Sequence, residues 1–154
     1  MGQDESKSTT FFRFEDLRVY SKAIGFVTLL TEASSLATND IESHFYKRFL
    51  EEATLIAFNI AEGSSKNKSS FVNQLKSAKT NIRKCVVFTT IGRQNDFINN
   101  EKEEEIRKQL MELTKMIGAL IISLQKNNNN YHHEINDIHE SQDGIDDFEE
   151  NIIW

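Results

Sequence analysis

The chain has 154 residues, a length that fits one domain, and 38% of them are hydrophobic, which is enough to form a core. A single cysteine excludes an intramolecular disulfide, and no apolar run approaches the roughly 18 residues of a membrane-spanning helix, so we expect a cytoplasmic protein. The net charge of −6 is unevenly distributed, because residues 127–154 carry eight acids and no Lys or Arg while residues 13–126 are mildly basic. This pattern predicts a flexible N-terminus over residues 1–12, a folded body over 13–126 and an acidic tail over 127–154.

The first two predicted helices are marked by apolar residues at alternating spacings of three and four, which share one helix face. The first helix spans about residues 15–36 and shows this pattern at Leu17, Tyr20, Ile24 and Val27. The second begins at Asp40, whose carboxylate suits an N-cap, and shows the pattern at Phe45, Phe49, Ala53, Ile56 and Ile60. Gly63 predicts a left-handed stop to this helix.

Two further helices are predicted after a polar connection over residues 64–70. Ser69 or Ser70 suits the N-cap of the third, whose apolar face is formed by Phe71, Leu75, Ala78, Ile82 and Cys85. The fourth has acids at its start, which favour the positive end of the helix dipole, and an apolar face formed by Ile106, Leu110, Leu113, Ile117, Leu120 and Leu124. The chain contains no proline to interrupt them. Four helices of similar length with short connections predict an all-α, antiparallel, up-down-up-down four-helix bundle with an acidic C-terminal extension.

The acidic tail follows a predicted polar break at residues 127–130. Its acids are interleaved with apolar residues, among them Ile135, Ile138, Ile145, Phe148 and Trp154. A tail that is only disordered and acidic needs no such residues. Two interpretations stay open: a tail that packs on the bundle or on a neighbouring subunit with its acids near Lys76, Lys79 or Arg83, and a tail that only maintains solubility.

Three pieces of sequence together carry a family resemblance. They are Phe14-Glu15-Asp16-Leu17 with Val19, Tyr20 and Ala23, then Asn59-Ile60-Ala61-Glu62-Gly63, then Ser69, Phe71, Leu75 and Ala78. In this order they resemble the four-helix-bundle family encoded in intervening sequences of bacterial 23S rRNA genes and, more distantly, the accessory variability determinants of diversity-generating retroelements. The resemblance covers about residues 12–126, and Asn59-Ile60-Ala61-Glu62-Gly63 is its most specific part.

The resemblance implies a four-helix bundle that assembles as a ring-shaped homopentamer, with no known catalytic activity and no cofactor. Binding to nucleic acid and to a reverse transcriptase is implied only for the retroelement branch. The chain departs from the family pattern at Ser70, Lys84 and Val86, where members usually carry glutamates. These departures lie on the third predicted helix, so the family's oligomer contacts and any shared ligand do not transfer directly to this chain.

Asn59 and Glu62 are three residues apart and therefore share a helix face. One interpretation is a polar functional site common to the family. The other is structural: Asn59 bonds the backbone of a neighbouring helix, and Glu62 bonds the loop after Gly63. We favour the structural interpretation, because buried polar groups need partners and helix ends leave carbonyls without them.

The third predicted helix carries the strongest charge signal. No acid occurs between Gly63 and Asn95, whereas seven basic residues do: Lys66, Lys68, Lys76, Lys79, Arg83, Lys84 and Arg93. Lys76, Lys79 and Arg83 are spaced by three and four and form one ridge, which could follow a phosphate backbone. The alternative, which the acidic total charge favours, is a solvated face balanced by acids of a neighbouring helix or subunit.

The sequence gives little support for metal binding, thiol chemistry or catalysis. His132, His133 and His139 stand among acids, but adjacent histidines on a helix do not converge on one ion, so we predict no metal site. Cys85 falls on the apolar face, where a free cysteine behaves as a small hydrophobe. We find no Gly-rich phosphate loop and no nucleophile with a placed base, and we therefore assign no catalytic residue.

Two functions fit these features: a non-enzymatic oligomeric structural or interaction module, and a nucleic-acid-binding accessory protein that uses the third helix. Several apolar residues lie outside or beside the main apolar faces, namely Phe11, Phe12, Phe26, Leu29, Phe58, Val87 and Phe88. Exposed together, they would form a larger apolar patch than monomers usually show. We therefore expect a homo-oligomer, of five subunits if the resemblance holds, and no membrane association.

Overall fold

The computed structural model describes residues 11–132, so the predictions for residues 1–10 and for the tail beyond His132 fall outside the described residues. The described part is helical: a short 3-10 helix η1 (Arg13–Asp16) precedes α1 (Arg18–Ser34), α2 (Asp40–Ser64), α3 (Lys68–Gln94) and α4 (Asn100–His132). No strand occurs among residues 11–132. The prediction of an all-α chain with four long helices is confirmed.

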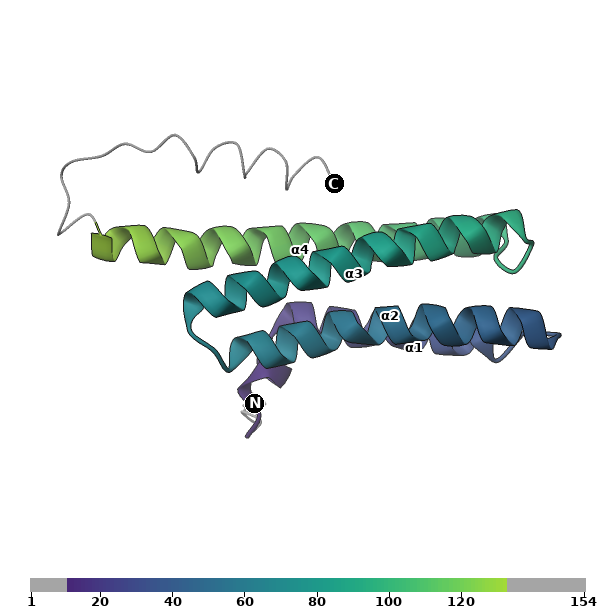
Figure 1. Cartoon of the computed structure of the whole chain (residues 1–154), viewed down its shortest axis with the longest axis horizontal. Coiled ribbons are helices and arrows are strands. Elements are labelled where there is room, and N and C mark those ends of the chain that lie inside the picture. The colour runs from purple at the N-terminus through teal and green to yellow at the C-terminus, as the bar shows by residue number, and fades with distance from the viewer. Residues whose placement is uncertain (1–10, 133–154) are drawn as a thin grey trace, which may run out of the picture.

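The four helices pack side by side as a bundle (Figure 1). Each helix contacts the next one along the chain, and α1 also contacts α4, while neither α1 and α3 nor α2 and α4 are neighbours. The colour sequence in Figure 1 shows that successive helices run in opposite directions. The connections at residues 35–39, 65–67 and 95–99 are short enough to join adjacent helix ends.

An asparagine serves as the N-cap of three of the four long helices. The side-chain oxygens of Asn39, Asn67 and Asn99 each accept a hydrogen bond of 2.8 to 2.9 Å from a backbone N–H three residues later. The predicted N-caps lie inside the helices instead: Asp40 is the first residue of α2, and Ser69 and Ser70 are the second and third residues of α3. The predicted caps were wrong because an asparagine immediately precedes each helix, and its amide oxygen satisfies the same unpaired N–H groups as a carboxylate or hydroxyl does.

Three other expectations about the helix bounds differ from the structure. The first helix is divided, because Leu17 is extended between η1 and α1, and α1 ends at Ser34. Helix α4 continues through residues 127–130, where a break was predicted, as far as His132. Gly63 does not stop α2 in a left-handed conformation, because its φ is not positive and α2 continues to Ser64.

The core is built from the inner faces of all four helices. The apolar faces predicted for α2 and α3 are completely buried, and that of α4 is buried from Ile106 to Ile117. The face predicted for the first helix is right in part: Leu17, Tyr20 and Val27 are half-buried against the core, whereas Ile24 is 42% exposed. The buried residues of α1 are Val19, Ala23, Phe26, Leu29, Leu30 and Ala33. Helix α1 carries apolar residues on two neighbouring faces, and spacing alone does not decide which of them is buried.

Not one of the helices within residues 11–132 combines the length and the apolar character needed to cross a bilayer.

Candidate nucleic-acid interface

The Asn59–Gly63 stretch lies in the last two turns of α2, where α2 meets the start of α3. Gly63 is buried there because α3 approaches it closely. A Cβ atom at position 63 would come within 2.6 Å of the Phe71 ring and 2.7 Å of the Gln74 Cβ atom. The glycine therefore permits close helix packing, which explains its place in the sequence better than a left-handed turn does.

Asn59 starts a chain of polar contacts between α2 and α3. Its amide nitrogen donates a 2.9 Å hydrogen bond to the Asn81 side-chain oxygen, and the amide nitrogen of Asn81 donates a 3.0 Å bond to Glu52. The other carboxylate oxygen of Glu52 lies 3.6 Å from the Lys84 ammonium. The partner of Asn59 is therefore a side chain of the neighbouring helix, rather than its backbone. Because Asn81 is buried, these bonds satisfy amide groups that would otherwise lack water.

Glu62 forms an ion pair of 3.7 Å with Lys66, which lies in the connection that follows α2. The Glu62 carbonyl also accepts a 2.8 Å hydrogen bond from the Ser65 hydroxyl. Both contacts close the end of α2 onto the loop after Gly63, as the structural interpretation predicts. The side chain is exposed, so the ion pair itself contributes little stability.

The structure divides the seven predicted basic residues into separate groups. Lys66 pairs with Glu62, Lys84 with Glu52, and Arg93 with Asp96 at 3.8 Å and Glu103 at 4.0 Å. Arg93 also donates a 2.9 Å hydrogen bond to Asn100, which fixes it at the α3–α4 turn. Acids of other elements thus engage three of the seven, as expected for a face balanced within the bundle, and Lys68 is exposed at the start of α3.

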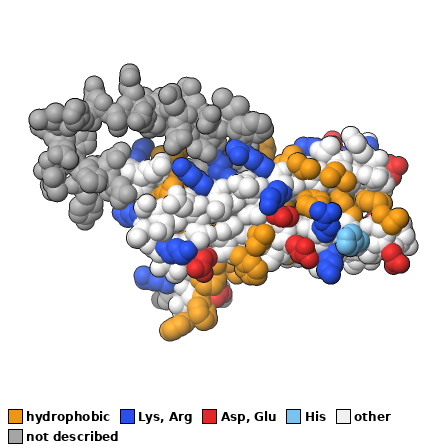
Figure 2. Space-filling model, viewed as in Figure 1, with side chains coloured by type: hydrophobic (Ala, Val, Ile, Leu, Met, Phe, Trp, Pro, Cys, Tyr) orange, Lys and Arg blue, Asp and Glu red, His pale blue; other side chains and the backbone are white. Residues whose placement is uncertain are grey.

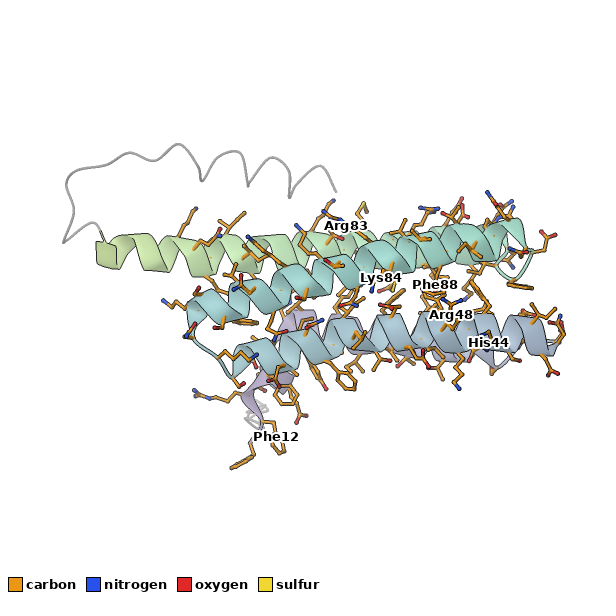
Figure 3. The ribbon with its side chains drawn as sticks, in the orientation of Figure 1. Phe12, His44, Arg48, Arg83, Lys84 and Phe88 are labelled. Carbon is orange, nitrogen blue, oxygen red and sulfur yellow. The ribbon has the colours of Figure 1, made fainter. Side chains whose placement is uncertain are left out.

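The predicted ridge of Lys76, Lys79 and Arg83 occupies one side of α3. Lys76 is half-buried, Lys79 is only 5% exposed and Arg83 is exposed. Burial lowers the pKa of Lys79, and the positive charges of Arg83 and Lys76 lower it further. In Figure 3, Arg83 extends toward the α4 side of the bundle, whereas Lys84 lies on the side of α2. The seven cations therefore do not form one continuous surface.

Sequence reasoning missed a basic and aromatic contact on the α2–α3 side. The Arg48 guanidinium of α2 lies 5.7 Å from the centre of the half-buried Phe88 ring of α3, close to exposed His44 (Figure 3). Phe88 in turn stacks on buried Phe49, with ring centres 5.4 Å apart. The contact joins residues forty positions apart, so spacing within one helix gave no signal for it. The exposed Lys and Arg of this view are interrupted by acids and apolar side chains (Figure 2).

The exposed apolar residues differ partly from the predicted set. Phe26 and Leu29 belong to the core, and Phe88 is half-buried, whereas Phe11, Phe12, Phe58 and Val87 are exposed as expected. Phe58, 62% exposed, lies where two surface hollows of α2 meet. The apolar residues that line the first hollow include Leu50 and Leu55, and those that line the second include Phe11, Phe12 and Phe14. Together these residues form an apolar surface that extends from the middle of α2 to η1.

The described part of the chain was predicted to contain neither a metal site nor a reactive thiol. Across residues 11–126, no three His, Cys, Asp or Glu side chains are placed to hold one ion. The region that contains His133 and His139 lies outside the described residues. Cys85 is completely buried, and burial, with the nearby charge of Glu52, raises the pKa of its thiol to about 12.

One known protein family has a model that matches most of this chain. A search of curated proteins found no match to the chain. The family model described as 23S rRNA-intervening sequence protein matches residues 15–119, which include α1, α2, α3 and most of α4. The match covers more than half of the chain and includes the Asn59–Gly63 stretch at the α2–α3 contact. The chain therefore belongs to the family of 23S rRNA-intervening sequence proteins.

Proposed function

We propose that this chain is a non-enzymatic interaction module that assembles with copies of itself into a closed ring, of five subunits as the sequence resemblance implies. The observation that carries the proposal is the apolar surface along α2 and η1, centred on Phe58. Monomeric proteins rarely leave several large apolar side chains exposed side by side. Burial of such a surface favours association by about 25 cal/mol per Å² of apolar area.

The shape of this surface suits a head-to-tail ring. Phe11 and Phe12 are 92% and 57% exposed, and their rings are in edge contact. Phe12 projects from the bundle below α2 (Figure 3). The hollow lined by Leu50, Leu55 and Phe58 lies further along α2. A projection and a hollow at different places on one subunit fit a head-to-tail contact, and such contacts close into rings when the rotation permits.

The test is the molar mass of the protein in solution, measured by light scattering during size-exclusion chromatography at micromolar concentration. We expect the mass of a closed oligomer, and replacement of Phe58 by Ser should reduce it toward that of the monomer. Val87→Ser is the matched control, because Val87 is similarly exposed, at 57%, but lies on α3. A monomeric wild-type protein, or equal effects of both substitutions, would contradict the proposal.

Nucleic-acid binding by α3 is the second candidate function. It is favoured by the absence of any acid between Gly63 and Asn95, and by the exposure of Arg83. It is weakened by the ion pairs that engage Lys66, Lys84 and Arg93. Titration with structured RNA and with DNA at two salt concentrations tests it, because binding to phosphates weakens steeply as salt rises. Arg83→Gln should then weaken binding, whereas Lys66→Gln, which removes a cation already paired with Glu62, should not.

A further inference from the structure

The outer side of the α3–α4 pair is a surface that combines positive charge with exposed apolar side chains. The two helices are in register there, because Arg107 of α4 donates a 3.1 Å hydrogen bond to Thr90 of α3. Counting by helical turns from this pair places Met111 of α4 opposite Val87 of α3, and Lys115 opposite Arg83. We call this surface the α3–α4 face, and its residues are Lys76, Lys79, Arg83, Val87, Arg107, Met111 and Lys115.

The α3–α4 face carries no acid along most of its length. Helix α3 has none, and between residues 106 and 126 the acid of α4 is Glu112. Glu112 is directed to the other side of α4, where it pairs with Lys22 of α1. Val87 and Met111 add apolar area to the face, since they are 57% and 51% exposed. The face therefore suits a ligand that is both acidic and apolar.

The chain itself contains such a ligand in residues 133–154. This segment has eight acids and no Lys or Arg. Five of its apolar residues are separated by intervals of three, seven, three and four positions, which is the spacing of one helix face: Ile135, Ile138, Ile145, Phe148 and Ile152. The segment complements the α3–α4 face in both charge and apolar character.

The segment is also attached at a suitable place. It follows His132, the last residue of α4, and α4 is the helix that forms one half of the face. Its 22 residues would span about 33 Å even as a fully helical chain. Folded back from the end of α4, a chain of this length extends as far as Met111, which lies 21 residues, or about 32 Å of helix, before His132.

We propose that residues 133–154 bind in cis along the α3–α4 face, with their apolar side chains on Val87 and Met111 and their acids beside Lys76 and Arg83. Salt screens exposed charges that are more than about 10 Å apart, whereas it screens partly buried charge pairs much less. The bound segment occupies the cations that a polyanion would need, so it acts as a built-in competitor for this face. The proposal is independent of the ring contact, which lies on α2 and η1.

On a helix, position 154 falls on the side opposite to the apolar face that contains Phe148 and Ile152, so the test places a fluorescent probe on that face instead. In a full-length variant with Phe148→Trp and Trp154→Phe, we expect tryptophan emission at shorter wavelength than that of free tryptophan, and several-fold weaker quenching by neutral acrylamide. The double substitution Lys76→Glu with Arg83→Glu should restore solvent-exposed emission and quenching, because it reverses two charges on the face. The matched control is Lys66→Glu with Lys68→Glu, which changes the net charge equally away from the face and should have no effect.

Three results would overturn the proposal: solvent-exposed tryptophan emission in the Phe148→Trp, Trp154→Phe variant, protection that survives Lys76→Glu with Arg83→Glu, or equal loss in the control. Circular dichroism of each variant shows whether the bundle is retained. If the charge reversal unfolds the bundle, Met111→Asp serves as the second variant, because Met111 is exposed and its replacement leaves the core intact. Protection that disappears on dilution would assign the segment to a neighbouring copy and contradict binding in cis.

Discussion

The α2–α3 and α1–α4 contacts hold the same bundle together in different ways. Helices α2 and α3 approach so closely that Gly63 has no room for a Cβ atom, and polar side chains join them through Asn81. Helices α1 and α4 have the less extensive contact, and an ion pair of Lys22 with Glu112 joins them. Gly25 of α1 is exposed and has no atom within 4 Å of an added Cβ. The comparison teaches that similar apolar spacing occurs in helices with a close contact and in helices with a less extensive one.

The largest expected effect concerns thiol reactivity at the tight contact. At pH 8 the Cys85 thiolate should be about a thousand-fold rarer than in the unfolded chain, because its pKa rises from 9.0 to about 12. We expect a thiol reagent to label the native protein only as fast as α2 and α3 separate. Labelling should be immediate in denaturant. A cysteine at Ala23 of α1, equally buried, in a Cys85→Ala background should be labelled faster if the α1–α4 side opens more easily.

The same pKa shift predicts the dependence of stability on alkaline pH. Because the folded state keeps the Cys85 proton that the unfolded state loses, its contribution is complete below pH 9.0 and is lost as pH rises toward about 12. Tyr46 acts in the same direction, since burial, with the charge of Glu42, raises the pKa of its hydroxyl. Cys85→Ala should flatten the decrease in unfolding free energy between these pH values. A pH profile identical to that of the wild type would contradict the assignment.

The second effect is steric. Gly63→Ala should lower the free energy of unfolding by about 1–3 kcal/mol, because overpacking forces rigid neighbours apart. The contact with the Gln74 Cβ atom is decisive, since that atom cannot move without its backbone. Urea denaturation measures the change. An unaltered midpoint would show that α2 and α3 are not held as closely as described.

The third effect concerns the polar link. Asn81→Ala removes the partner of the Asn59 amide and one of the two partners of Glu52, and it should cost about 1–2 kcal/mol, within the range for buried groups that lose a hydrogen bond. Asn73→Ala is a suitable control, because Asn73 lies on α3 but is exposed. Equal unfolding free energies for the two variants would show that the polar link does not stabilise the α2–α3 contact.

The smallest effect has the opposite sign. Gly25→Ala should stabilise the protein by about 0.5–1 kcal/mol, because alanine is the better helix residue and the added methyl group meets no neighbour. The paired substitutions at Gly25 and Gly63 therefore distinguish an open position on α1 from the close α2–α3 contact by the sign of the stability change. A loss of stability from Gly25→Ala would indicate that α1 packs against a surface absent from the isolated subunit.

Helix positions were predictable where one face alone is apolar. On α3, for example, Leu75, Ala78 and Ile82 are all buried, because the rest of that helix is largely polar. On α1 the same reasoning selected Ile24 instead of Phe26, since two neighbouring faces are apolar and only contact with the other helices decides between them. The family resemblance and the acid-free stretch of α3 were also readable, because both lie within continuous sequence.

The candidate site was less predictable, because its contacts join different helices. Nothing in the spacing of α3 indicates that Glu52 of α2 engages Lys84, or that Arg48 covers Phe88. The role of Gly63 was misread for the same reason: a glycine near a helix end suits a left-handed turn and a close helix approach equally well, and only the position of Phe71 distinguishes them. Pairwise contact between helices depends on register and rotation, which single-helix patterns do not encode.

The asparagine caps at residues 39, 67 and 99 have a consequence for the ageing of the protein. Asparagine is prone to deamidation, which converts its amide to a carboxylate and is a common form of chemical damage. A carboxylate accepts the same hydrogen bond from the backbone N–H, and its negative charge is favourable at the positive end of the helix dipole. Deamidation to aspartate at these three turns would therefore leave the helix starts intact.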